Sequence, residues 1–121
     1  MNDDPAQGEA ARQALGAASL IAFTVPALCE LVWVLSRIYK RPRPEIAAAI
    51  RLLVDADVAV TDRPTVDAGL AVLDAGGDFA DGAIAHAGRM LGGTTFLTFD
   101  EAGASLVRRT GGEARAVVDA H

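Results

Sequence analysis

The sequence predicts an α/β fold in which helices cover a central, mostly parallel sheet on both faces. Short apolar segments alternate along the chain with segments whose apolar residues recur at helical spacing. The short segments are apolar throughout, which is typical of parallel strands buried on both faces. The 121 residues are 51% hydrophobic and contain no linker or internal repeat, so we expect residues 1–121 to form one domain.

The first part of the chain predicts a helix, a strand and a second helix. Residues 5–18 are expected to form a short helix with Pro5 in its first turn. Residues 19–25 are apolar and partly β-branched, which favours a buried strand, and Pro26 closes it. From Pro26 to about residue 39 the apolar residues fall at helical intervals, so a helix is expected there.

The same alternation continues to the C-terminus. Prolines open the next helices, and the glycine pairs at 76–77 and 92–93 mark helix ends. We expect further helices at 45–54, from Pro64 to Gly76, at 79–91 and at 101–109, and strands at 58–60, 94–99 and 114–118.

Residues 15–35 also have the length and apolarity of a membrane-spanning helix. The basic residues that follow would suit its cytoplasmic flank. Glu30, however, lies deep in this run, where a carboxylate is costly to bury in lipid, and Pro26 interrupts it. A strand followed by a helix explains this segment better, and we expect no membrane association.

Net charge and cysteine content exclude several classes of protein. The formal charge of −5 argues against a protein that grips nucleic acid by charge alone, so a nucleic-acid role would have to be local or enzymatic. The single cysteine, Cys29, excludes a disulfide framework and a cysteine-rich zinc site. No basic, signal-like segment precedes Leu15, and these features together favour a cytoplasmic protein.

Three carboxylates are expected near the ends of parallel strands. Asp100 follows directly on a strand, and Glu30 lies in the early turns of the helix that follows another strand. Asp81 begins a helix and shares its predicted inward line with Ile84. Sites gather at this edge of α/β sheets. Carboxylates that converge there repel one another unless a hard cation lies between them, and Mg2+ or Mn2+ is the natural occupant.

Each carboxylate also has a structural explanation. Asp78 and Asp100 could cap the helices that follow them, and we favour that role for Asp78. For Asp81 and Asp100, spacing alone leaves a structural role and a site role open. Glu30 shares a side of its helix with Trp33, away from the apolar stripe, so periodicity alone predicts a solvated side chain.

The segments that hold these acids resemble the second, third and fourth acidic motifs of PIN-domain nucleases, especially those of VapC toxins from bacterial toxin–antitoxin pairs. They are PALCELVWVLSRIY, GGDFADGAIAHAGRMLGG and TTFLTFD, in the family's order and spacing. The resemblance implies a three-layer α/β/α domain, metal-binding roles for Glu30, Asp81 and Asp100, and Mg2+-dependent cleavage of RNA. It also implies a homodimer and a VapB-like antitoxin that occludes the site.

One feature of that family has no counterpart in this sequence. Its members begin with a strand that ends in a further aspartate, ahead of a segment like NDDPAQ, which here follows Met1. We therefore expect the first strand and the first aspartate to be missing. A start codon placed too far downstream would explain this, and the intact state of the remaining acids favours that explanation. A truly shortened gene would instead encode a non-catalytic module that dimerises or binds the antitoxin.

Basic and aromatic residues follow Glu30 closely. The densest basic cluster consists of Arg37, Lys40, Arg41 and Arg43. It could attract RNA phosphates, or it could complement the dipole at a solvated helix end. Trp33 and Tyr39 are predicted to be core or dimer-contact side chains rather than platforms on which bases stack.

Overall fold

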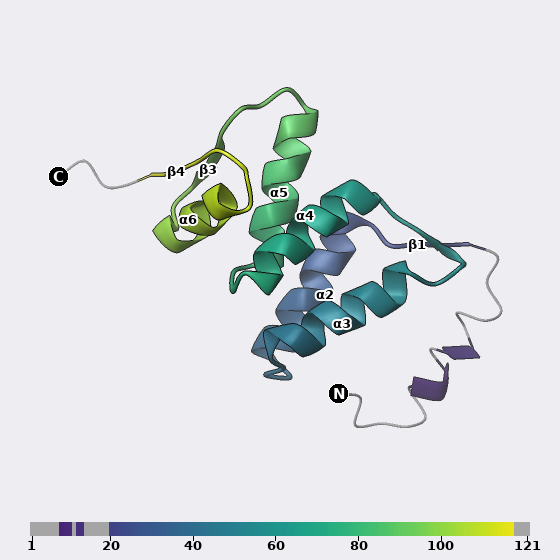
Figure 1. Ribbon diagram of the computed structural model, residues 1–121. Coiled ribbons are helices and arrows are strands. Elements are labelled where there is room, and N and C mark those ends of the chain that lie inside the picture. Colours follow the sequence, from purple (N-terminus) through teal and green to yellow (C-terminus); the bar gives the residue numbers. More distant parts are fainter. Residues whose placement is uncertain (1–7, 11, 14–19, 118–121) are drawn as a thin grey trace. The chain divides into compact units, whose positions relative to one another are not determined.

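The computed structural model describes residues 8–10, 12–13 and 20–117 and divides the chain into two compact units, Met1–Thr61 and Asp62–His121 (Figure 1). Each unit pairs two short parallel strands and carries helices beside them. The predicted α/β fold class with parallel strands is confirmed. That residues 1–121 form one domain stays a prediction.

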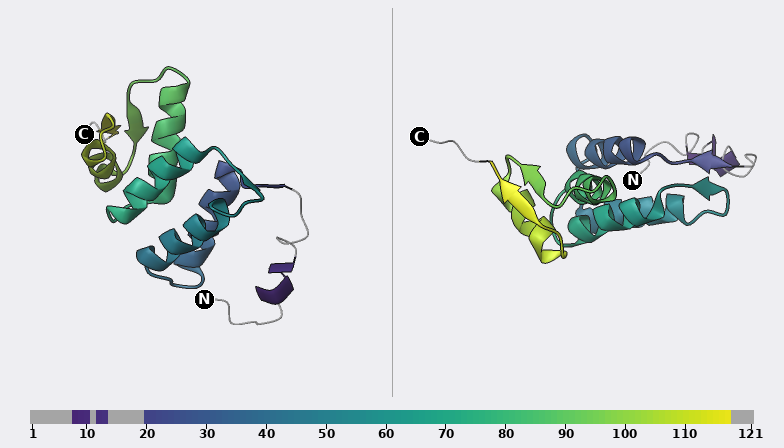
Figure 2. Two further views of the ribbon diagram at one scale, coloured as in Figure 1. Left: turned by 45° about the vertical axis from the view of Figure 1, so that its right-hand side comes forward. Right: turned by 90° about the horizontal axis from the view of Figure 1, so that it is seen from above.

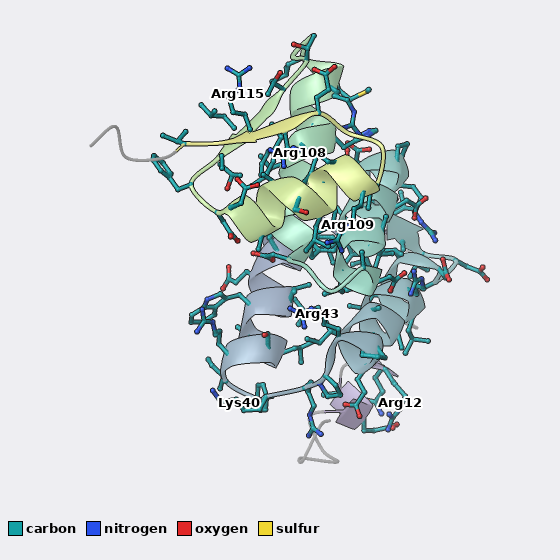
Figure 3. All side chains as sticks on the ribbon, turned by 60° about the vertical axis from the view of Figure 1, so that its left-hand side comes forward. Arg12, Lys40, Arg43, Arg108, Arg109 and Arg115 are labelled. Carbon is teal, nitrogen blue, oxygen red and sulfur yellow. The ribbon has the colours of Figure 1, made fainter. Side chains whose placement is uncertain are left out.

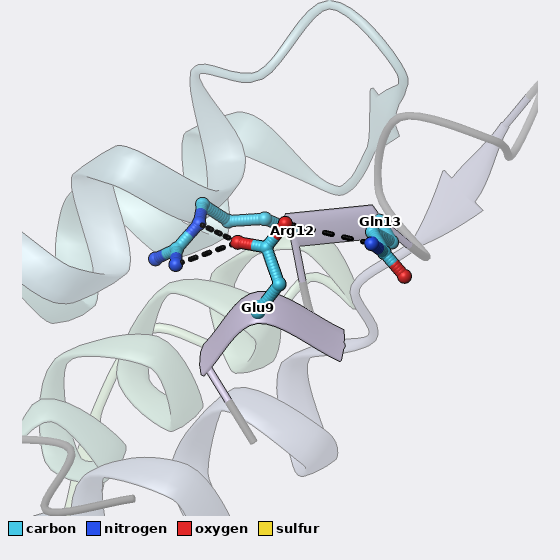
Figure 4. Close-up of polar contacts among 3 residues, drawn as sticks. All are labelled: Glu9, Arg12 and Gln13. Carbon is cyan, nitrogen blue, oxygen red and sulfur yellow. Dashed lines mark hydrogen bonds and ion pairs between the residues drawn. The ribbon is translucent and has the colours of Figure 1, made fainter. Parts of the chain in front are cut away.

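The first unit begins with helical residues at 8–10 and 12–13, within the helix predicted for residues 5–18. The other residues of that predicted helix lie outside the described ranges. The Arg12 guanidinium donates hydrogen bonds of 3.2 and 2.9 Å to one oxygen of Glu9, and the Gln13 amide donates one of 3.5 Å to the other (Figure 4). These contacts join residues three and four apart, as a helical turn requires.

Strand β1 (Ile21–Ala22) leads directly into helix α2 (Val25–Arg37). The Thr24 hydroxyl caps this helix by accepting a hydrogen bond of 3.3 Å from the Ala27 amide, and Pro26 occupies the first turn. The predicted change from strand to helix at Pro26 is therefore confirmed. None of the helices in the described ranges combines the length and apolarity needed to cross a membrane.

Helix α3 (Arg43–Val54) begins beside two prolines, and strand β2 (Ala59–Val60) completes the first unit. Strands β1 and β2 pair in parallel, with Ile21 opposite Ala59 and Ala22 opposite Val60. Helices α2 and α3 pack on each other. The apolar faces that α2 and α3 bury consist of Leu28, Val32, Leu35, Ile46, Ala47, Ile50 and Val54.

The second unit contains α4 (Arg63–Asp74), α5 (Phe79–Met90), β3 (Phe96–Thr98), α6 (Glu101–Arg109) and β4 (Ala114–Ala116). Strands β3 and β4 pair in parallel, with Leu97 opposite Arg115. Arg108 on α6 donates a hydrogen bond of 2.9 Å to the Ala114 carbonyl and so ties α6 to β4.

Helices α4 and α5 lie against each other at close range (Figure 2). A Cβ atom on Gly69 of α4 would lie 2.7 Å from the ring of Phe79, and one on Gly82 of α5 would overlap the Ala68 carbonyl. Because neither glycine has a side chain, the two backbones approach closely and the Phe79 ring is fully buried. The small residues of these helices thus set how closely they pack.

Three sequence expectations are corrected. The strands are shorter than the apolar runs that predicted them, because apolarity reports burial whereas a strand also needs a hydrogen-bonded neighbour. Ile84 is 57% exposed instead of lining the core, because α5 packs through its glycine and alanine face. Trp33 and Tyr39 are 56% and 49% exposed, so the prediction of a core position for them is wrong. Their role as dimer contacts stays a prediction.

Candidate functional site

Asp81 is held by the first turn of α5. Asp78 caps this helix by accepting a hydrogen bond of 3.1 Å from the Ala80 amide through Oδ1. Its carbonyl oxygen accepts another of 3.1 Å from the Asp81 amide. The predicted capping role of Asp78 is confirmed. Asp81 stands two residues after the helix start and is half-buried.

Asp100 links the end of β3 to the start of α6. Its Oδ1 atom accepts a hydrogen bond of 3.0 Å from the Ala102 amide, and its own amide donates one of 3.1 Å to the Thr98 hydroxyl. The capping role left open for Asp100 is therefore confirmed, and Asp100 comes two residues after the end of β3. Its role in a metal site stays a prediction. Only one carboxylate oxygen makes the cap bond, so Oδ2 is left for another role.

Gly103 on α6 is the point on which these two acids converge. A Cβ atom on this residue would lie 2.6 Å from Oδ2 of Asp81 and 3.3 Å from Oδ2 of Asp100. The two oxygens therefore face the same small space beside the α6 backbone and are no further apart than the sum of these distances. Residues 19 positions apart in sequence are brought together by the packing of α6 beside α5.

The surroundings of Asp81 disfavour an ionised carboxylate there while Asp100 is also ionised. Burial raises the pKa of the Asp81 carboxyl, and the nearby charges of Asp78 and Asp100 raise it further. A cation between the carboxylates would reverse this effect. Mg2+ binds carboxylate oxygens together with water molecules, and Mn2+ prefers the same oxygen ligands. The residues present therefore fit either ion.

Glu30 lies on α2 in the first unit and is exposed, as its position away from the apolar stripe predicts. Its contribution to the site of Asp81 and Asp100 stays a prediction. Within residues 8–10, 12–13 and 20–117, no group of three or more His, Cys, Asp or Glu side chains is arranged to hold a metal ion. The structure thus brings two of the three predicted acids together.

Gly103 was not identified from the sequence. A glycine inside a nine-residue helix is unfavourable by about 1 kcal/mol relative to alanine, so its presence three residues after Asp100 is a usable signal of close approach. The sequence cannot say which atoms approach it, because the nearest atom belongs to Asp81 on another helix.

Replacing Gly103 with alanine is expected to change the free energy of unfolding by about 1 kcal/mol or less, because the nearest atom is the tip of the Asp81 side chain, which can move aside, and because alanine favours the helix. It should also weaken Mn2+ binding, because the methyl group displaces the Asp81 carboxylate. Urea unfolding and calorimetric titration with Mn2+ measure the two effects.

Gly88→Ala is the matched control for this substitution. Gly88 also lies inside a helix, but a Cβ atom there would have no neighbour within 4 Å. We expect Gly88→Ala to be neutral or to stabilise by up to about 1 kcal/mol through helix propensity. Equal Mn2+ affinities and equal unfolding free energies in the two variants would show that Gly103 does not constrain the carboxylates.

Comparison with known proteins gives one result. A family model described as the PIN domain matches residues 1–109, which is most of the chain. Searches of curated proteins and of solved structures gave no significant match. PIN domains are generally metal-dependent nucleases, and the family fold is of the α/β/α type. From this match, we conclude that the chain belongs to the PIN domain family.

Proposed function

We propose that this protein is a Mg2+-dependent endoribonuclease of the VapC type, the toxin of a VapBC-type toxin–antitoxin pair. The observation that carries the proposal is the convergence of Asp81 and Asp100 on the space beside Gly103. These two acids, joined by Glu30, would hold Mg2+, and Mn2+ would serve in its place. Membership of the PIN family supports a metal-dependent nuclease.

The bound metal would supply an activated water molecule and would stabilise the leaving oxygen of the RNA backbone. The protein's own part is to fix the carboxylates. The Ala102 amide holds Oδ1 of Asp100, so the rotation of this side chain is limited and Oδ2 stays directed at the shared space. The cap at Asp78 fixes the first turn of α5 and with it the position of Asp81.

The remaining parts of the proposal concern partners and location. The protein would act in the cytoplasm as a homodimer, and a VapB-like antitoxin would occlude the acidic site. PIN domains often occur as toxin–antitoxin ribonucleases, which supports this assignment.

Cleavage of a mixed RNA pool tests the proposed activity. The protein, and a version extended by the codons upstream of Met1, should be incubated with Mg2+ and in parallel with EDTA. We expect Mg2+-dependent fragments that EDTA abolishes. If only the extended version cuts, the activity stands and requires residues ahead of Met1. If both versions are folded and neither cuts, the proposal is wrong, and a non-catalytic module that binds the antitoxin becomes the better explanation.

A further inference from the structure

One face of α2 is open to solvent along its length. Leu28, Val32 and Leu35 bury the opposite face, each at 5% exposure or less. Glu30 and Trp33 share the open face, because they are three residues apart, and Arg37 follows one turn later. Trp33 is 56% exposed.

The turn after α2 extends this face. Tyr39 is 49% exposed. Lys40 adopts a left-handed backbone conformation, with φ of 55°, and projects from the turn that joins α2 to α3 (Figure 3). We call Trp33, Arg37, Tyr39 and Lys40 the α2 face.

The positive charges of the α2 face are not neutralised within the described part of the chain. Arg37 and Lys40 form no ion pair with another described residue, whereas Arg12 lies 2.9 Å from Glu9. The next arginine along the chain, Arg41, lies 3.9 Å from Glu45. In a protein with a net charge of −5, the α2 face is therefore a local site for an anionic partner.

We propose that the α2 face binds single-stranded RNA, with a base stacked on Trp33 and with Arg37 and Lys40 on the phosphates. Exposed aromatic rings beside unneutralised cations are the combination that binds single strands, since every base has a face to stack and every linkage carries a charge. This inference rests on the proposed function, because Glu30, a proposed metal ligand, is one helical turn from Trp33 on the same face. An RNA strand on the α2 face would therefore pass beside Glu30.

A second copy of the chain suits this face less well. In a two-fold symmetric contact the same patch meets itself, so Arg37 and Lys40 would approach like charges. Lysine is depleted at protein interfaces, whereas tryptophan, tyrosine and arginine are enriched there, so the charge of this face and not its residue types argues against self-association. RNA complements both the charge and the aromatic surface.

Trp33 is the protein's single tryptophan, so its fluorescence reports directly on this face. Titration with a short oligouridine in EDTA, which prevents metal-dependent cleavage, should quench the emission. The same titration with labelled RNA, followed by anisotropy, should show Trp33→Leu binding about tenfold or more weakly, since one stacked base is lost. Arg37→Ala and Lys40→Ala should each reduce the salt dependence of log K by about 0.7, the value for one phosphate contact on a single strand.

Arg12→Ala is the matched control, because Arg12 is also exposed but is paired with Glu9. It should leave RNA affinity and its salt dependence unchanged. The proposal is wrong if Arg37→Ala behaves like Arg12→Ala, or if oligouridine leaves the emission of Trp33 unaltered. It is also wrong if Trp33→Leu turns a dimer into a monomer in sedimentation without weakening RNA binding, since the face would then serve self-association. Because binding is measured without metal, absence of RNA cleavage would refute the proposed activity and leave this test unaffected.

Discussion

Replacing Asp81 with asparagine is expected to reduce RNA cleavage by at least about 100-fold while leaving the fold intact. Loss of residues that only support a metal ligand already lowers affinity or activity by about 10–100-fold, so loss of a ligand should have a larger effect. The amide is nearly the same size as the carboxylate and fits the space beside Gly103, but it carries no charge for the cation. Release of labelled RNA fragments in Mg2+ measures the effect in a version of the protein that cuts RNA.

Asp78→Asn is the matched control, because it makes the same chemical change three residues earlier in the same turn. Asparagine caps helices as well as aspartate does, so the start of α5 should be preserved. Asp78→Asn should retain most of the activity. Unchanged cleavage by Asp81→Asn, or equal losses in the two variants, would remove Asp81 from the mechanism.

The stability of Asp81→Asn gives an independent check on this site. In the metal-free protein the pKa of Asp81 is raised, so the folded state binds this proton more readily than the unfolded state does. Ionised Asp81 therefore destabilises the fold at pH 7, and asparagine should raise Tm in EDTA. This difference in Tm between Asp81→Asn and the original protein should shrink as the pH falls through the pKa of Asp81 in the folded state. It should vanish below the ordinary aspartate pKa, where Asp81 is protonated in both the folded and the unfolded state. Added Mg2+ should raise Tm of the original protein only, because it binds the folded form.

Local features of the fold could be predicted because they depend on neighbours in sequence. Pro26 lies in the first turn of α2, shortly after β1, and Asp78 and Asp100 cap the helices that follow them, as their positions indicate. The helix predicted from Pro64 is also found as α4, with Val66 and Leu70 buried at 0% and 2% exposure. In each case a residue within one or two helical turns determines the outcome.

Features that depend on packing between elements could not be predicted in the same way. The approach of Asp81 to Asp100 depends on Gly103, and nothing in the spacing of these residues indicates that α6 packs beside α5. Hydrophobicity placed Trp33 in the core or at an interface between copies. Its helical position beside Glu30, however, agrees with the exposure that the structure shows. At Trp33 the position on the helix therefore predicts exposure better than the hydrophobicity of the side chain does.

Replacing Phe79 with alanine is expected to lower the free energy of unfolding by about 3–5 kcal/mol, the usual cost of removing a buried aromatic side chain. Phe79 is fully buried at the start of α5, and its ring lies against α4 where Gly69 has no side chain. Folded domains have only about 5–15 kcal/mol of stability in total, so this single change should consume a large part of it. Urea unfolding followed by circular dichroism measures the loss.

Ile84→Ala separates burial from the simple loss of an apolar side chain on α5. Ile84 lies five residues after Phe79 on the same helix but is 57% exposed, so its truncation should change stability by about 0.5 kcal/mol or less. Since Phe79 stands between Asp78 and Asp81, its removal should also loosen the turn that holds Asp81, and Mn2+ binding should weaken in Phe79→Ala but not in Ile84→Ala. Comparable losses of stability in the two variants would contradict the packing of α5 on α4. A destabilised Phe79→Ala that binds Mn2+ normally below its unfolding transition would instead show that the first turn of α5 is held by its cap alone.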